Sequence, residues 1–193
     1  MATTLQNLPE RALKAIAPAA TADEPYLAIY MNDQLALGVV WREIARRSQK
    51  SNQATELGAA LERVATAIAE DIVTFENIMQ RIGIPKNNAK PVLAMAGERF
   101  GRLKLNGHLR GYSPLSRFQE LDILVMGIAN KVTLWENLRD HAGLGARLPD
   151  IDFGELIERA HGQRTQLEPF HAQAGRAALG ADARPASAYT SSM

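Results

Sequence analysis

Five side chains have the types and positions that a metal site in a helical protein could use. Asp33, Asp71 and Asp122 each lie three or four residues from apolar positions of a predicted helix, and Glu168 with His171 forms a Glu-x-x-His pair. Carboxylates and imidazoles are the usual ligands of iron and manganese. A carboxylate inside a protein is costly unless it is paired or bound to metal. The candidate metal ligands are therefore Asp122, Glu168, His171, Asp33 and Asp71.

The Glu-x-x-His pattern occurs on one predicted helix only. Glu158 with His161 and Glu168 with His171 both lie near the C-terminal end of the chain. The second predicted helix has no histidine, and the position three residues after Glu70 is Val73. A two-metal site in a helical bundle draws such pairs from two helices. The pattern therefore gives half of a motif.

The alternative is that these acids pair with the chain's own cations. Arg164 lies one helical turn before Glu168, which suits an ion pair along one helix. Counting from the predicted turns places Asp122 and His171 at the same level. With a long crossover between the hairpins, Asp71 lies about eight residues, or about 12 Å, from the level of Asp122. We favour the structural interpretation.

Four long amphipathic helices must position these side chains. Apolar residues at 3.6-residue spacing, with polar turns, Gly and Pro at the ends, predict helices over 23–50, 55–82, 113–143 and 152–180. Ile29 and Leu37 are placed on the inward face of the first helix. Short turns join the helices into two antiparallel hairpins. Residues 83–113 form a crossover with a short helix at about 90–104.

The remaining segments are predicted to lie outside the bundle. Residues 1–22 form an N-terminal arm, residues 23–180 the bundle, and residues 181–193 a disordered tail. The stretch 98–117 has five Lys or Arg and one Glu, a local charge of +4. We expect it to be a solvated or subunit-facing loop, because no nucleic-acid-binding motif frames it.

Composition excludes several classes of function. The 193 residues include no cysteine, which excludes thiol nucleophiles, disulfides and cysteine-ligated zinc or iron–sulfur clusters. A net charge of +1 gives no general reason to expect nucleic acid or an anionic membrane as partner. No apolar run is long enough for a membrane span or a signal peptide. We expect a cytoplasmic protein.

The hairpin, crossover, hairpin arrangement resembles the ferritin-like superfamily, and more loosely its small bacterial stress-associated members of unknown function. The resemblance covers about residues 26–179. It is supported by the residue pattern of two segments, YLAIYMNDQLALGVVWREIA and ELGAALERVATAIAEDIVTFENIMQRIGI. It implies an all-α, ferritin-like four-helix bundle with a helical crossover. Di-iron members would imply oxidase or iron-storage chemistry, and the second helix of this chain departs from their ligand pattern.

The leading hypothesis is a non-catalytic bundle that acts by association, as a homo-oligomer such as a dimer. Candidate apolar contacts are Trp41, Met95, Phe100 and Tyr112. We expect no cofactor, no membrane and no nucleic-acid partner. The alternative is a metal-dependent oxidase or iron-handling protein that uses iron or manganese. A third option is a small-ligand pocket between helices around Pro169.

Overall fold

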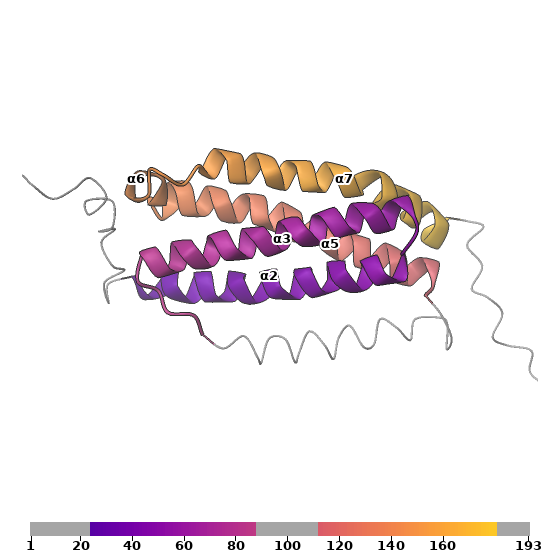
Figure 1. Ribbon diagram of the computed structural model, residues 1–193, viewed down its shortest axis with the longest axis horizontal. Helices are drawn as coiled ribbons and strands as arrows, with labels where there is room; N and C mark the ends of the chain where they lie inside the picture. Colours follow the sequence, from indigo (N-terminus) through magenta and orange to yellow (C-terminus); the bar gives the residue numbers. More distant parts are fainter. Residues whose placement is uncertain (1–23, 88–111, 181–193) are drawn as a thin grey trace, which may run out of the picture.

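The computed structural model describes residues 24–87 and 112–180, and every regular element in these two ranges is helical. Four long helices lie side by side along the molecule (Figure 1). The predicted arm 1–22, the short crossover helix at about 90–104 and the tail 181–193 lie outside the described residues. In the part that is described, no helix combines the length and apolar character needed to cross a bilayer.

The first hairpin consists of α2, Pro25–Ser51, and α3, Glu56–Arg81. Proline at the start of α2 suits the first turn, where its missing N–H is not needed. The turn ends at Thr55, whose side-chain Oγ1 accepts a hydrogen bond from Gly58 N at 3.0 Å. Both helices match the predicted ranges to within one or two residues.

The second hairpin consists of α5, Pro114–Glu136, and α7, Phe153–Leu179, with Ser113 and Asp152 as N-caps. The sequence predicted one helix as far as residue 143, which is wrong beyond Glu136. There the chain changes to a π-helical turn, η1, Asn137–His141, and then to the short helix α6, Leu144–Arg147. A π turn inserts one residue per turn, which hydrophobic periodicity does not reveal.

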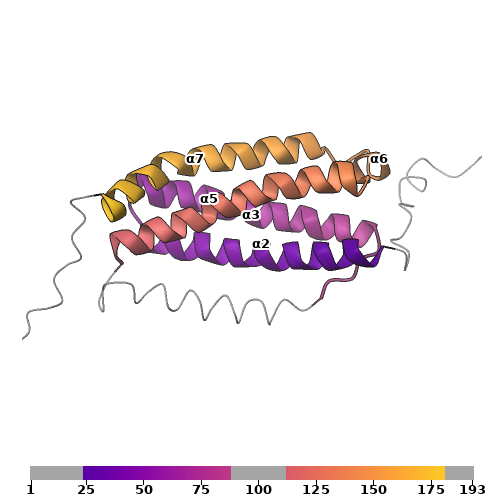
Figure 2. The ribbon, with the colours of Figure 1, turned by 180° about the vertical axis from the view of Figure 1, so that it is seen from behind.

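The two hairpins pack with α2 beside α3 and α5, and α7 beside α3 and α5 (Figures 1 and 2). At one end, Asn87 N donates to Asn32 Oδ1 at 2.7 Å. At the opposite end, Tyr112 Oη accepts from Asn52 Nδ2 at 3.2 Å. Residues 88–111 therefore connect opposite ends of the bundle. It follows that α5 runs parallel to α3 and antiparallel to α2.

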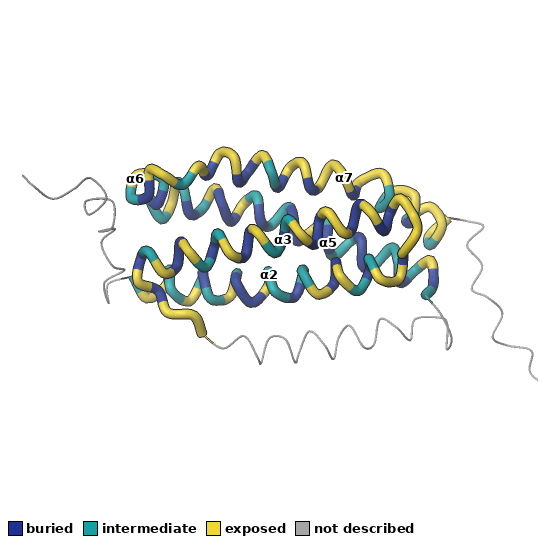
Figure 3. The backbone as a smooth tube through the Cα atoms, in the orientation of Figure 1, coloured by how far each residue is buried: buried dark blue, intermediate teal, exposed yellow. Residues whose placement is uncertain are grey.

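The core lies between the four long helices, and their outer faces are exposed (Figure 3). The predicted inward face of α2 is wrong in its N-terminal half. Ile29 is 58% exposed and Leu37 is 37% exposed, whereas Met31 and Leu35 are buried. This helix has apolar residues on both faces, so periodicity alone does not define which face is buried. Asp33 shares the exposed face.

Candidate functional site

A buried ion-pair cluster joins the two hairpins in the middle of the bundle. We call Asp71, Lys131, Gln163 and Arg159 the central cluster. Lys131 Nζ of α5 lies 2.5 Å from Asp71 Oδ2 of α3. From α7, Arg159 Nη2 donates to Asp71 Oδ1 at 2.9 Å, and Gln163 Nε2 donates to Asp71 Oδ2 at 3.2 Å. Both carboxylate oxygens of Asp71 therefore accept hydrogen bonds from this chain.

Gln163 and Arg159 have further contacts beside those to Asp71. Lys131 Nζ donates to Gln163 Oε1, so the amide of Gln163 contacts both members of the ion pair. Arg159 also contacts Glu70 Oε2 at 3.3 Å. Two cations thus face two carboxylates, although Glu70 lies at the surface. Because charges removed from water need such compensation, the arrangement accounts for a buried lysine and aspartate in the core.

Burial is the main influence on the pKa of Lys131. Desolvation lowers the pKa of the amine, while the charge of Asp71 and its hydrogen bond raise it, and the charge of Arg159 lowers it. The net result is a pKa below the ordinary value for lysine. The amine is therefore easier to deprotonate than a surface lysine, because the loss of water around its charged form outweighs the stabilisation by Asp71.

Two of the five predicted ligands come together, and we call Asp122 and His171 the outer pair. His171 Nε2 lies 3.0 Å from Asp122 Oδ1, which confirms that the two residues lie at the same level. The imidazole stacks on the ring of Phe118, with 5.2 Å between centroids. Both side chains remain partly exposed. The outer pair therefore lies at the edge of the α5–α7 interface.

The other predicted ligands lie apart from the outer pair. Glu168 accepts from Arg164 Nε at 2.8 Å, which confirms the ion pair suggested by their spacing. Asp33 is exposed on α2, so its predicted inward position is wrong. Asp71 contacts Lys131, nine residues beyond Asp122 on α5, which agrees with the expected axial offset. The described residues contain no group of three or more possible metal ligands.

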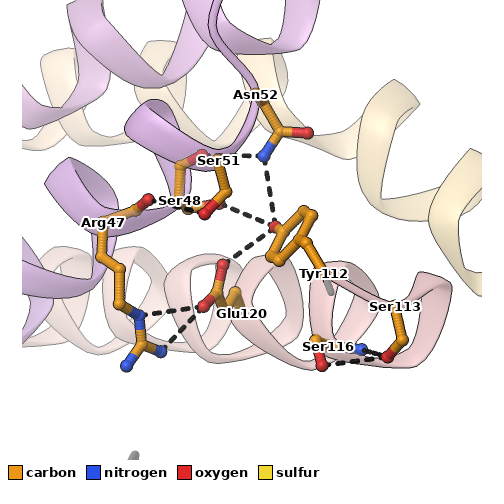
Figure 4. A network of polar contacts seen from close by, with 8 residues as sticks. All are labelled: Arg47, Ser48, Ser51, Asn52, Tyr112, Ser113, Ser116 and Glu120. Carbon is orange, nitrogen blue, oxygen red and sulfur yellow. Dashed lines mark hydrogen bonds and ion pairs between the residues drawn. The ribbon is translucent and has the colours of Figure 1, made fainter. Parts of the chain in front are cut away.

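A second polar network closes the end of the bundle where the connection re-enters (Figure 4). Glu120 of α5 is buried, and its Oε1 lies 2.8 Å from Arg47 Nη2 of α2. Tyr112 Oη donates to Glu120 Oε2 at 2.9 Å. The same hydroxyl lies close to Ser48 Oγ, at 3.4 Å, and to Asn52 Nδ2. This network attaches the start of α5 to the turn of the first hairpin.

Burial also affects the phenol of Tyr112. Desolvation raises its pKa, and the nearby negative charge of Glu120 raises it further, while hydrogen bonds from Ser48 and Asn52 lower it. The guanidinium of Arg117 lies 5.3 Å above the ring. Tyr112 is therefore part of this network and not a free apolar contact. Trp41, another predicted contact, packs on the core beside Gly127, and Met95 and Phe100 lie outside the described residues.

The sequence interpretation missed the partners of Asp71. Lys131 lies three residues after Ile128 and four before Trp135, both buried, so helical spacing places it on the inward face of α5. A lysine in that position requires an anionic partner, which was the available signal. Arg159 and Gln163 are four residues apart on α7 and reach Asp71 together. Only tertiary packing identifies which acid they contact.

Comparison of the chain with protein-family models, curated proteins and solved structures gave no match. Inference about function therefore rests on the geometry described above.

Proposed function

We propose that this chain is a ferritin-like four-helix bundle without a complete di-metal site, and that it acts by association with a second copy of itself and not by catalysis. Two hairpins joined by a connection between opposite ends of the bundle support the ferritin-like assignment. The hydrogen bonds to both oxygens of Asp71 support the incomplete site, because that carboxylate already serves two cations.

The observation that carries association is an apolar stripe on the outer side of α2. Tyr26, Ile29 and Leu37 are 84%, 58% and 37% exposed. Their spacing places them within roughly a quarter turn of one another on the helix. Apolar groups gathered on one face are typical of protein–protein contact surfaces. A twofold dimer is the commonest assembly that buries one such face on both copies.

Light scattering after size-exclusion chromatography tests this proposal. The parent chain should have the mass of a dimer at micromolar concentrations, and Ile29→Glu should shift it toward the monomer because it places a charge in the apolar contact. Val73→Glu is the matched control. Val73 is also an exposed apolar residue, at 67%, but on α3. A parent chain that is monomeric at every concentration would contradict association between copies.

A second candidate is a metal-dependent oxidase or iron-handling protein. The contact between His171 Nε2 and Asp122 Oδ1 favours it, because it brings an imidazole and a carboxylate together at a half-exposed position. The test is the rate at which the protein oxidises added iron(II) in air, followed by absorbance. This candidate requires protein-dependent oxidation that His171→Ala abolishes. A rate equal to that of buffer alone would remove it.

A further inference from the structure

A small cavity lies beside the central cluster, between α2, α3 and α5. Its volume is about 40 Å³. Aliphatic and aromatic side chains form most of its wall, with Gly38 and Gly127 on opposite helices. The polar residues that reach the wall are Gln34, Asp71 and Lys131. The cavity is therefore apolar over most of its surface and polar at one side.

Trp135, which also lines this cavity, has a hydrogen-bond donor without an acceptor. The residue is 1% exposed, and its Nε1 is the one buried side-chain nitrogen or oxygen in the described ranges that has no partner. The acceptors on the wall have other donors, since Asp71 accepts from Lys131 and Gln34 Oε1 accepts from Asn130 at 2.9 Å. A buried donor left unpaired lowers the stability of the folded chain. A molecule in the cavity that offers an acceptor to this N–H would remove that cost.

The size and charge of the cavity limit that molecule. A water needs about 10–15 Å³ on this measure of volume, so the cavity holds roughly three or four non-hydrogen atoms. The two charged residues on the wall, Asp71 and Lys131, balance each other, and an ionic ligand would lie in the core without a counter-ion. The unpaired group is a donor only. A neutral molecule that accepts but need not donate fits best.

We propose that this cavity binds a small neutral ketone, whose carbonyl oxygen accepts from Trp135 Nε1 and whose alkyl groups contact the apolar wall. The site differs from the surface proposed for association, so either can fail without the other. Trp41, which is half-buried beside Gly127, lines the side of the cavity between α2 and α5.

The test follows the indole N–H of Trp135 by ¹H–¹⁵N NMR while acetone is added. The chain has two tryptophans, so Trp41→Phe leaves one indole signal and assigns it. We expect acetone to shift the Trp135 signal downfield and to saturate. The larger 3,3-dimethyl-2-butanone carries the same carbonyl group but exceeds the cavity, and it should produce no saturable shift.

Gly38→Ala is the matched variant. A Cβ at Gly38 would lie 3.5 Å from Ile72 Cγ1, an ordinary contact, so the protein should fold while the added methyl group takes part of the cavity. Acetone affinity should fall about tenfold. A shift that never saturates, or equal affinity in Gly38→Ala and the parent chain, would overturn the proposal. Filling of the cavity by water alone, with no response to acetone, would also overturn it.

Discussion

The central cluster and the outer pair each join a carboxylate to a nitrogen base across packed helices, yet water reaches them very differently. The side chains of Lys131 and Asp71 are 9% and 5% exposed, whereas those of His171 and Asp122 are 27% and 46% exposed. The central cluster connects α3 with α5 and α7, and so connects the two hairpins. The outer pair connects α5 with α7, within one hairpin.

This difference indicates what each group can do. In the central cluster, the loss of one partner leaves the other charged in a low-dielectric interior, so its members act as a structural unit. In the outer pair, solvent compensates for a lost partner, and the contact contributes little to stability. The role of an inward-facing acid therefore depends on how deeply it is buried in the bundle.

The largest expected effect comes from removing the central carboxylate. Asp71→Leu leaves Lys131 buried beside Arg159 and should lower the free energy of unfolding by about 3–5 kcal/mol. Replacing both members, in Asp71→Leu with Lys131→Met, should recover most of this loss, because an apolar pair can replace a buried ion pair. Urea unfolding measures the parent chain and both variants. A double variant no more stable than Asp71→Leu would show that the two residues do not act as a pair.

Next in size is a pH dependence that arises from Lys131. Its pKa is lowered in the folded chain, so the unfolded chain binds more protons between that value and about 10.4. The stability of the parent chain relative to Lys131→Met should therefore rise with pH across this window, by at most about 1.4 kcal/mol per pH unit. Urea unfolding at pH values from neutral to alkaline measures the slope. A difference that stays flat or falls would contradict the effect of burial on Lys131.

A smaller effect is expected at the edge of the central cluster. Arg159 donates to Asp71 from a side chain that is 33% exposed, and Arg159→Met should cost about 1 kcal/mol because Lys131 still compensates the carboxylate. Arg63→Met is a matched control. Arg63 donates to Gln166 at 3.2 Å across the same two helices, but on the surface. Thermal unfolding measures both variants. Equal losses of stability in Arg159→Met and Arg63→Met would indicate that burial of Asp71 adds nothing to the contact.

The smallest effect should come from the outer pair. Asp122→Asn should change the free energy of unfolding by at most about 1 kcal/mol, and the change should vanish at high salt because exposed charges are screened. The cost of Asp71→Leu should persist under the same conditions. Chemical unfolding by urea at low and high sodium chloride makes the comparison. A large loss of stability in Asp122→Asn that does not depend on salt would show that the outer pair is a structural unit like the central cluster.

Local signals predicted the helices well and the contacts between them poorly. The N-caps Thr55, Ser113 and Asp152 lie at the starts of α3, α5 and α7, where side-chain oxygens satisfy free backbone N–H groups. Such signals depend on a few neighbouring residues. The π-helical turn η1 has no equivalent signal, so the helix predicted from periodicity runs through it.

The candidate site shows the same limit. The contact between Asp122 and His171 could be predicted, because both residues belong to one hairpin and their levels are counted from the connection within it. The partners of Asp71 come from the other hairpin, across a connection of 32 residues, 82–113, whose length fixes no register. Lys131 was recognisable as an inward cation, but its pairing with Asp71 depends on how the two hairpins dock.

Metal content tests most directly the claim that Asp71 is the partner of the chain's own cations. The protein is purified without chelator, supplied with iron(II) or manganese(II), desalted and measured by mass spectrometry, beside Asp71→Asn and His171→Ala. We predict less than stoichiometric metal in the parent chain and no difference among the three proteins. Stoichiometric iron or manganese in the parent chain, lost in Asp71→Asn, would contradict this account.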